Sequence, residues 1–242
     1  MRQAEERYIS LLTDFGFKRI FGTAPNKDLL INFLNALFKK EQVITDVKYL
    51  NSEKVGDVYT DRKAIKLQHV YVVALLNFDM QDEAFDKRKI SHGVGLLDKK
   101  TKKVFNDKLT FKYVEIAKFD KPLDKLRTLY DKWLFALKNL SRLENRPKEL
   151  RDKIFDKLFA EAEIAKFSRK ELMEYEDSLK AYRDIKNSLD TAIEKGRAEG
   201  RAEGKAEANF ETARKMLSDG LPNDVVMKYT GLSEDDLRDL NK

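Results

Sequence analysis

The spacing of apolar and polar residues divides the chain near residue 119. Before that point the apolar runs are short. Val43–Leu50 (VITDVKYL) and Leu109–Ile116 (LTFKYVEI) alternate, which predicts half-buried strands. Val70–Leu76 is apolar and β-branched, and it is too short for an independent helix. It therefore predicts a strand buried on both faces. A turn between Gly95–Leu97 and Val104–Phe105 predicts a hairpin.

Helical spacings of three and four residues flank this region. Arg2–Leu12 is predicted to open the chain as a helix, and the large residues of Leu29–Phe38 share one helical stripe. Beyond Pro122 this period dominates, with stripes over Leu123–Leu137, Leu150–Phe159 and Leu172–Leu189. The pattern predicts an α+β fold. A small mixed α/β layer over residues 1–119 is followed by an all-helical C-terminal region.

Residues 193–209 contain a four-residue repeat, Glu194–Glu207 (EKGRAEGRAEGKAE), with Gly196, Gly200 and Gly204 in register. One interpretation is a helix whose glycine face admits a second helix closely, and a second copy of the chain is the simplest partner. The other is a partly helical, flexible connector. We predict four parts, namely residues 1–119, a helical region over 120–192, this repeat over 193–209, and a tail over 210–242.

The tail has the outline of a helix-turn-helix. Gly220 and Gly231 are predicted to end two short helices, and Ser233–Asp236 forms a capping box that opens a third. This last helix, SEDDLRDL, is acidic. Because phosphates would repel it, a packing or oligomerisation role is favoured over insertion into a DNA groove.

Charge is distributed unevenly between the two halves. The chain carries a net +6; residues 1–119 hold 22 Lys and Arg against 16 Asp and Glu, and residues 120–242 hold 26 against 26. Part of the excess lies in the predicted hairpin turn, at Lys99, Lys100, Lys102 and Lys103. These lysines are candidate nucleic-acid-binding residues. The alternative is that they only keep a small sheet soluble.

Composition excludes several kinds of site. Cysteine is absent, which rules out disulfides, thiolate zinc sites and a cysteine nucleophile, and fits a cytoplasmic location. His69 and His92 are the only histidines, too few for a histidine metal cluster. We expect no glycine-rich phosphate loop, signal peptide or membrane-spanning segment from these residues.

Carboxylates near a lysine remain as candidate chemistry. A magnesium-dependent phosphodiesterase needs acids that hold the metal and a lysine that helps to orient the attacking water. Asp61 and Lys63 have the acid-x-lysine spacing, and Asp57 lies just upstream. The alternative is a solvated turn before the strand that starts at Val70. These three residues are the only catalytic candidates, and no metal ligand is assigned.

Most of the chain resembles a known family. The matching segments are ISLLTDFGFKRIFG, NKDLLINFLNALF, DVKYLNSEKVGDVYTDRKAI, VYVVALLNF, DKKTKKVFNDKLTFKYVEIAKF, the stretch from LFAEAEIAKF to the glycine repeat, and the tail MLSDGLPNDVVMKYTGLSEDDLRDL. Together they are similar to the recombination-promoting nuclease and transposase family, a branch of the PD-(D/E)XK nucleases. The resemblance implies a nuclease-like N-terminal layer, Mg²⁺-dependent DNA cleavage, and a link to DNA recombination and mobile elements.

The resemblance breaks where that family has its catalytic centre. Between Ile65 and Val70, family members carry a strand with a metal-binding Asp, a strand with Glu-x-Gln or Glu-x-Lys, and a helix. This chain has only KLQH there. No residue matches the catalytic positions, so none is carried over, and Asp14, Phe17, Lys18 and Phe21 are interpreted as scaffold. Whether the chain is an enzyme therefore stays open, and Mg²⁺ is expected only if it is active.

Three functional hypotheses follow. The first is a DNA-associated family member with a lost or reduced catalytic centre, which pairs with itself or with a full-length relative. The second is a non-catalytic oligomerisation or regulatory protein that touches no DNA. The third is a Mg²⁺-dependent endonuclease with a displaced site at Asp57, Asp61 and Lys63. We expect no membrane partner under any of the three.

Overall fold

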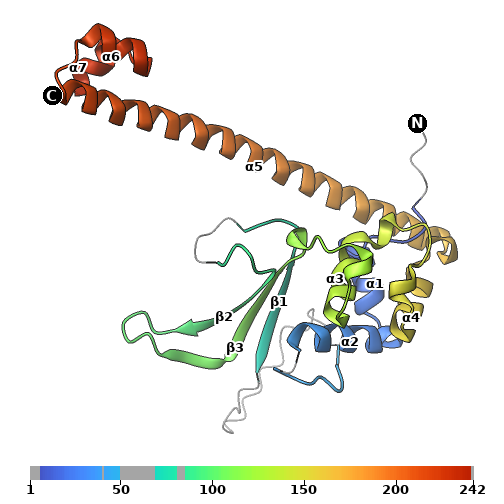
Figure 1. The fold of residues 1–242 in the computed structure, drawn as a ribbon. Coiled ribbons are helices and arrows are strands. Elements are labelled where there is room, and N and C mark those ends of the chain that lie inside the picture. The colour runs from blue at the N-terminus through green and yellow to red at the C-terminus, as the bar shows by residue number, and fades with distance from the viewer. Residues whose placement is uncertain (1–5, 40, 50–68, 81–84, 241–242) are drawn as a thin grey trace, which may run out of the picture. The chain divides into compact units, whose positions relative to one another are not determined.

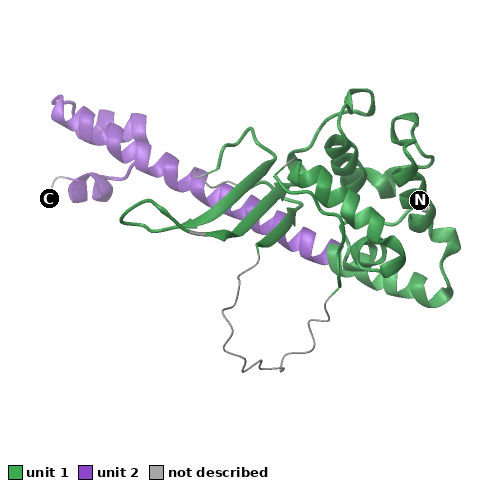
Figure 2. Cartoon of the chain, turned by 90° about the horizontal axis from the view of Figure 1, so that it is seen from below, with its two compact units in different colours: residues 1–182 green, residues 183–242 purple. Residues whose placement is uncertain are grey.

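The structure is a computed structural model that describes residues 6–39, 41–49, 69–80 and 85–240. The chain divides into two compact units, residues 1–182 and 183–242 (Figure 2). The helices and strands of unit 1 are α1 (Asp14–Phe21), α2 (Lys27–Phe38), β1 (Val70–Leu76), β2 (Ser91–Leu97), β3 (Val104–Glu115), α3 (Leu129–Asn139) and α4 (Lys153–Ala162). Helix α5 (Arg169–Ser218) begins in unit 1 and continues into unit 2, which also holds α6 (Asn223–Thr230) and α7 (Glu234–Leu240).

The described residues of unit 1 form one small mixed sheet in the order β1-β3-β2 (Figure 1). Strand β1 runs parallel to β3, and β2 runs antiparallel to it with a register shift after Gly95. Val73 and Leu75 of β1 pack against the core, but Val72 is 41% exposed. The expectation that this strand is buried on both faces is therefore wrong for one face. The predicted α+β class is confirmed.

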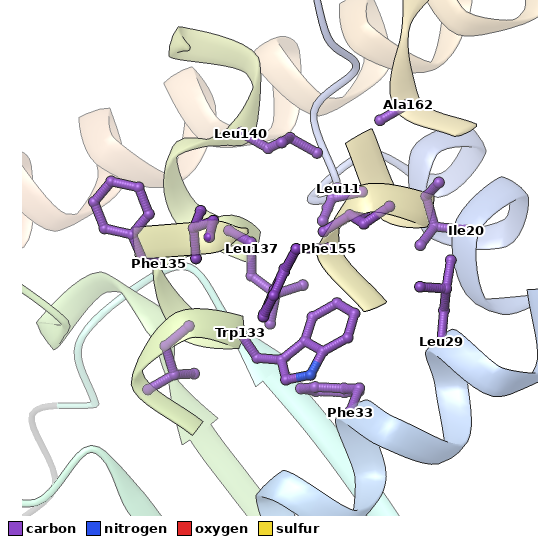
Figure 3. Packing of buried hydrophobic residues seen from close by; sticks show 14 of the residues in the cluster. Leu11, Ile20, Leu29, Phe33, Trp133, Phe135, Leu137, Leu140, Phe155 and Ala162 are labelled. Carbon is purple, nitrogen blue, oxygen red and sulfur yellow. The ribbon is translucent and has the colours of Figure 1, made fainter. Parts of the chain in front are cut away.

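The core of unit 1 lies among its helices, around one tryptophan. Trp133 of α3 is fully buried. Its ring centroid lies 5.0 to 5.7 Å from the ring centroids of Phe21 in α1, Phe33 in α2 and Phe155 in α4. Figure 3 shows Trp133 with Phe33 and Phe155. Its indole N–H donates to Oδ1 of Asn32 at 2.8 Å, so the polar atom is satisfied. Three of the helical stripes predicted from the sequence, over Leu29–Phe38, Leu123–Leu137 and Leu150–Phe159, each supply a ring to this cluster.

The structure corrects the prediction of a strand at residues 43–50. Residues 41–49 are described and contain no strand. The side chain of Asn35 explains the difference, because its amide donates to the Ile44 carbonyl at 2.8 Å and accepts from the Ile44 N–H at 2.7 Å. Both backbone groups that a strand would pair are therefore used by one side chain. Val43, the first residue of this segment, is 76% exposed.

The structure also corrects the prediction of a helix at the start of the chain. Residues 6–12 are not helical, and Tyr8 instead forms a bridge to Glu163 after α4. The Ile9 N–H donates to the Ala162 carbonyl, and the Ile164 N–H donates to the Arg7 carbonyl, both at 3.0 Å. These long-range pairs satisfy the backbone groups that a helix would pair locally.

Unit 2 contains a second, smaller core at its C-terminal end. Ala213, Val226 and Leu237 are fully buried and join α5, α6 and α7. The two glycines that end helices have left-handed backbones, with φ of 81° at Gly220 and 71° at Gly231, as their positions predict. Helix α5 is continuous through the glycine repeat. Within the described ranges, no helix has both the length and the apolar character needed to cross a lipid bilayer.

Candidate functional site

A buried polar cluster lies where β1 and β3 end. Glu115, the last residue of β3, is fully buried. Its Oε1 accepts from the Met80 backbone N–H at 2.6 Å, and its Oε2 lies 3.0 Å from Nε2 of His92 and 2.8 Å from Nζ of Lys118. The same Nζ lies 3.0 Å from Oδ1 of Asp79. We call these residues, Asp79, Met80, His92, Glu115 and Lys118, the Glu115 cluster.

The fold brings the cluster together from three segments. The parallel register places Leu76 opposite Glu115, so the chain leaving β1 passes the end of β3. The Glu115 N–H donates to the Ile90 carbonyl at 2.8 Å, which brings the start of β2 alongside. A single 3-10 turn over Ile116–Lys118 follows Glu115. This turn brings Lys118, three residues after Glu115, back to the Glu115 carboxylate. The Phe85 ring covers His92 edge-on at 4.9 Å.

The Glu115 cluster has the chemistry of an ionic clamp. The hydrogen bond that Lys118 donates to Glu115 raises the pKa of Lys118 above its ordinary value. Burial opposes this increase, and the hydrogen bond to Asp79 adds to it. Three donors already occupy the two oxygens of Glu115, so the carboxylate has little capacity left for a cation. Among the described residues, no three His, Asp or Glu side chains are grouped so that they could hold a metal ion. The described residues therefore do not fit the Mg²⁺ that the resemblance implies.

The catalytic candidates Asp57, Asp61 and Lys63 lie outside the described residues. Two of the residues interpreted as scaffold, Asp14 and Lys18, form an exposed ion pair at 2.8 Å along α1.

The lysine-rich turn between β2 and β3 is exposed throughout. Asp98 organises it, because its carboxylate accepts from the backbone N–H groups of Lys100 and Thr101, and the Thr101 bond holds the pKa of Asp98 below its ordinary value. Lys102 has a left-handed backbone, with φ of 59°. Phe105, next to the turn, is 77% exposed. Figure 1 shows the turn at the end of the sheet away from helices α1–α4.

This turn has the composition of a nucleic-acid contact. Four lysines supply positive charge, and exposed apolar side chains lie beside them: Leu97, Val104 and Phe105. Contacts to DNA phosphates need positive charge, and stacking on unpaired bases uses an exposed aromatic ring such as that of Phe105. We call residues 97–105 the basic turn.

The helix-turn-helix of unit 2 has the opposite charge. Residues 206–242 hold eight acidic and five basic side chains, a net charge of −3. Ser233 and Asp236 form the predicted capping box, with the Ser233 N–H donating to the carboxylate at 2.8 Å and the Asp236 N–H donating to the hydroxyl at 3.2 Å. A groove of about 760 Å³ between α5 and α7 is lined by five carboxylates, those of Glu203, Glu207, Glu211, Asp236 and Asp239.

Sequence reasoning missed the Glu115 cluster. The two histidines were counted only to exclude a metal centre, and neither Glu115 nor Lys118 was singled out. One signal was available, because Leu109, Phe111, Tyr113 and Glu115 share one face of the alternating strand. An acid that continues an apolar stripe must find partners if it is buried.

Comparison with known proteins gives the family. A profile of the PD-(D/E)XK nuclease family transposases matches residues 11–65 and 62–192, and a profile of the Rpn/YhgA-like nuclease family C-terminal HTH domain matches residues 206–242. No curated protein and no solved structure matches the chain. The two pieces of the first match meet at residues 62–65, beside the junction between Ile65 and Val70. Because that profile covers most of the sequence, the chain belongs to the PD-(D/E)XK nuclease family transposases.

Proposed function

We propose that this protein is a DNA-binding member of its family whose hydrolytic centre is lost or reduced, and that the basic turn makes part of the DNA contact. The observation that carries the proposal is the basic turn itself, with four lysines beside the exposed Phe105 on a nuclease-family scaffold. The helix-turn-helix match adds a second domain of a DNA-binding type.

The reduced centre is inferred from the break in the family pattern. The match in two pieces that meet at residues 62–65 supports a shortened middle segment. The grouping of charged side chains supports it too, since the acids of the Glu115 cluster are engaged by Lys118, His92 and a backbone N–H. A DNA-associated protein of this kind would occupy sites without cutting them.

Salt-dependent binding to duplex DNA tests the DNA contact. We expect the logarithm of affinity to fall linearly with the logarithm of salt concentration. Changing Lys99, Lys100, Lys102 and Lys103 to Ala should reduce that slope by about three to four, roughly one for each lost phosphate contact. The matched control removes four exposed helical lysines, Lys148, Lys153, Lys170 and Lys180. An equal loss of slope in the control would show that only total charge matters, which contradicts the assignment to the turn.

Incubation with DNA and either Mg²⁺ or Mn²⁺ tests the reduced centre. We expect no cleavage. Metal-dependent cleavage that Asp61→Ala abolishes would contradict the proposal and favour the endonuclease with a displaced site at Asp57, Asp61 and Lys63.

One observation favours the second function, a non-catalytic oligomerisation or regulatory protein. The helix-turn-helix is acidic, and α7 carries Glu234, Asp235, Asp236 and Asp239. Phosphate repulsion opposes insertion of that helix into a DNA groove. A salt slope near zero, or no binding to duplex DNA, would favour this alternative.

A further inference from the structure

A long stretch of α5 in unit 2 is uncovered in the structure. Every side chain from residue 183 to residue 208 is exposed except Ile193, which is half-buried. Ile185 is 71% exposed and Leu189 is 37% exposed. Isolated helices are marginal in water, and most helical stability in proteins comes from packing. A stretch that also contains three glycines, each of which weakens a helix about fivefold relative to alanine, calls for a packing partner.

The apolar residues of this stretch lie on one face. With about 100° between successive residues, Ile185, Leu189, Ile193, Gly196 and Gly200 fall within about 80° of one another. A Cβ added at Gly196 or at Gly200 would have no atom within 4 Å, so the face is open at the glycines. The apolar half supplies area to bury, and the glycine half permits close approach of another backbone.

Charged side chains of opposite sign flank the row of glycines, which turns by about 40° around the helix at each repeat. Arg197, Arg201 and Lys205 each follow a glycine by one residue, about 100° to one side; Glu199, Glu203 and Glu207 each follow by three, about 60° to the other side. Lys195 and Glu199 form an ion pair at 3.8 Å. Among the described residues, the other five of these six charges have no ion-pair partner.

Symmetry decides which arrangement of two copies these flanks allow. In a parallel pair, the two-fold axis runs along the helices, so the basic flank of one copy faces the acidic flank of the other. In an antiparallel pair, the axis is perpendicular to the helices, so basic faces basic and acidic faces acidic. Opposite charges across a helix pair set partner choice and orientation.

We propose that two copies of this chain pair through residues 185–207 of α5 with their helices parallel. Arg197, Arg201 and Lys205 of each copy then face Glu199, Glu203 and Glu207 of the other. The occupant of the open face is a second copy, because the two flanks of the glycine row carry complementary charges at each glycine, and two helices that cross along this row bring the flanks together. This inference goes beyond the proposed function, since pairing requires neither DNA nor a catalytic centre.

Sedimentation of the full-length chain tests pairing, with circular dichroism to verify that each variant stays helical. We expect a dimer at micromolar concentration that weakens as salt is added.

A charge-reversed variant, with Arg197, Arg201 and Lys205 changed to Glu, should dimerise at least tenfold more weakly. So should the opposite variant, with Glu199, Glu203 and Glu207 changed to Lys, and an equimolar mixture of the two should restore pairing. Reversal of Lys148, Lys153 and Lys170, which lie elsewhere, should leave the dimer unchanged. A wild-type monomer at about 100 μM, or unchanged dimerisation of both variants, overturns the proposal.

Single cysteines test the orientation, because the chain has none of its own. In a parallel pair, Leu189→Cys should form a disulfide with the same residue of the other copy. In an antiparallel pair centred on Gly200, the two Leu189 positions are about 33 Å apart along the helices, so failure to crosslink overturns the parallel arrangement. Asn187→Cys, about 160° from the middle of the face, is the control and should not crosslink.

Gly200→Leu separates pairing from helix stability. Leucine is a better helix former than glycine, so an unpaired helix should become more stable. If the face is occupied by a second copy, the added side chain should weaken the dimer at least tenfold. Unchanged or tighter dimerisation would contradict close approach at the glycines.

Discussion

Nε2 of His92 and Oε2 of Glu115 lie 3.0 Å apart in the buried end of the sheet, where Lys118 approaches the same oxygen at 2.8 Å. The contact joins β2 to β3 through side chains 23 positions apart in the sequence. Its position, at the last paired residues of β1 and β3, makes it the point where three segments of unit 1 are held together.

Removing the Glu115 side chain should destabilise unit 1 strongly. Glu115→Ala leaves the Lys118 ammonium, whose side chain is 12% exposed, with Asp79 as a partner, and it leaves His92 and the Met80 N–H without their acceptor. We expect a loss of about 3 kcal/mol in the free energy of unfolding, measured by urea denaturation. Glu115→Gln keeps an acceptor oxygen and should cost less. Equal losses for both variants would show that the charge contributes nothing.

Alkaline pH should weaken the same cluster. The pKa of Lys118 is raised in the folded state, so its contribution is fully present below the unfolded pKa of about 10.4 and is lost as pH rises through the higher folded value. Unfolding free energies measured from pH 8 to pH 11 should therefore fall more steeply for the wild type than for Lys118→Met. Lys153→Met, at an exposed position, should keep the wild-type slope.

Trp133→Ala should remove the centre of the helical core. The ring is fully buried against three phenylalanine rings, so truncation leaves a large cavity and an unpaired Asn32 amide. We expect a loss of about 3 to 5 kcal/mol, measured by denaturation. Trp133→Phe retains most of the volume and should lose less. A loss below about 1 kcal/mol for Trp133→Ala would contradict the packing described.

Gly16→Ala should be costly because the backbone is close. A Cβ there would lie 2.1 Å from the Ser10 carbonyl oxygen and 2.9 Å from Oγ1 of Thr13, so the chain before α1 would have to move. We expect a loss of about 1 to 3 kcal/mol in thermal or urea unfolding. Gly93→Ala is the matched control, since nothing lies within 4 Å of its added Cβ. It should be neutral or slightly stabilising.

Local patterns predicted the elements whose signals are local. The stripes of α2, α3 and α4 were visible in the sequence, as were the strands at Val70–Leu76 and Leu109–Ile116 and the glycines that end α5 and α6. The capping box at Ser233 and Asp236 also forms as expected. In each case the decisive interaction lies within a few residues, where spacing alone is informative.

Interactions that are distant in sequence account for the failures. The Asn35 amide prevents a strand at Val43–Leu50, and Ala162 and Glu163 draw residues 7–9 into a bridge instead of a helix. The Glu115 cluster likewise depends on the register of three strands, which spacing along the chain does not specify. The basic turn was predicted because its four lysines lie within five consecutive residues.

The left-handed backbone of Lys102 has an evolutionary consequence. An L-residue with a side chain pays about 1 kcal/mol for a φ of 59°, whereas glycine adopts it freely and asparagine tolerates it. Random substitution filtered only for a stable hairpin would drift toward those two residues at this position. The lysine at this position therefore keeps a positive charge in the basic turn at a cost of about 1 kcal/mol in folding.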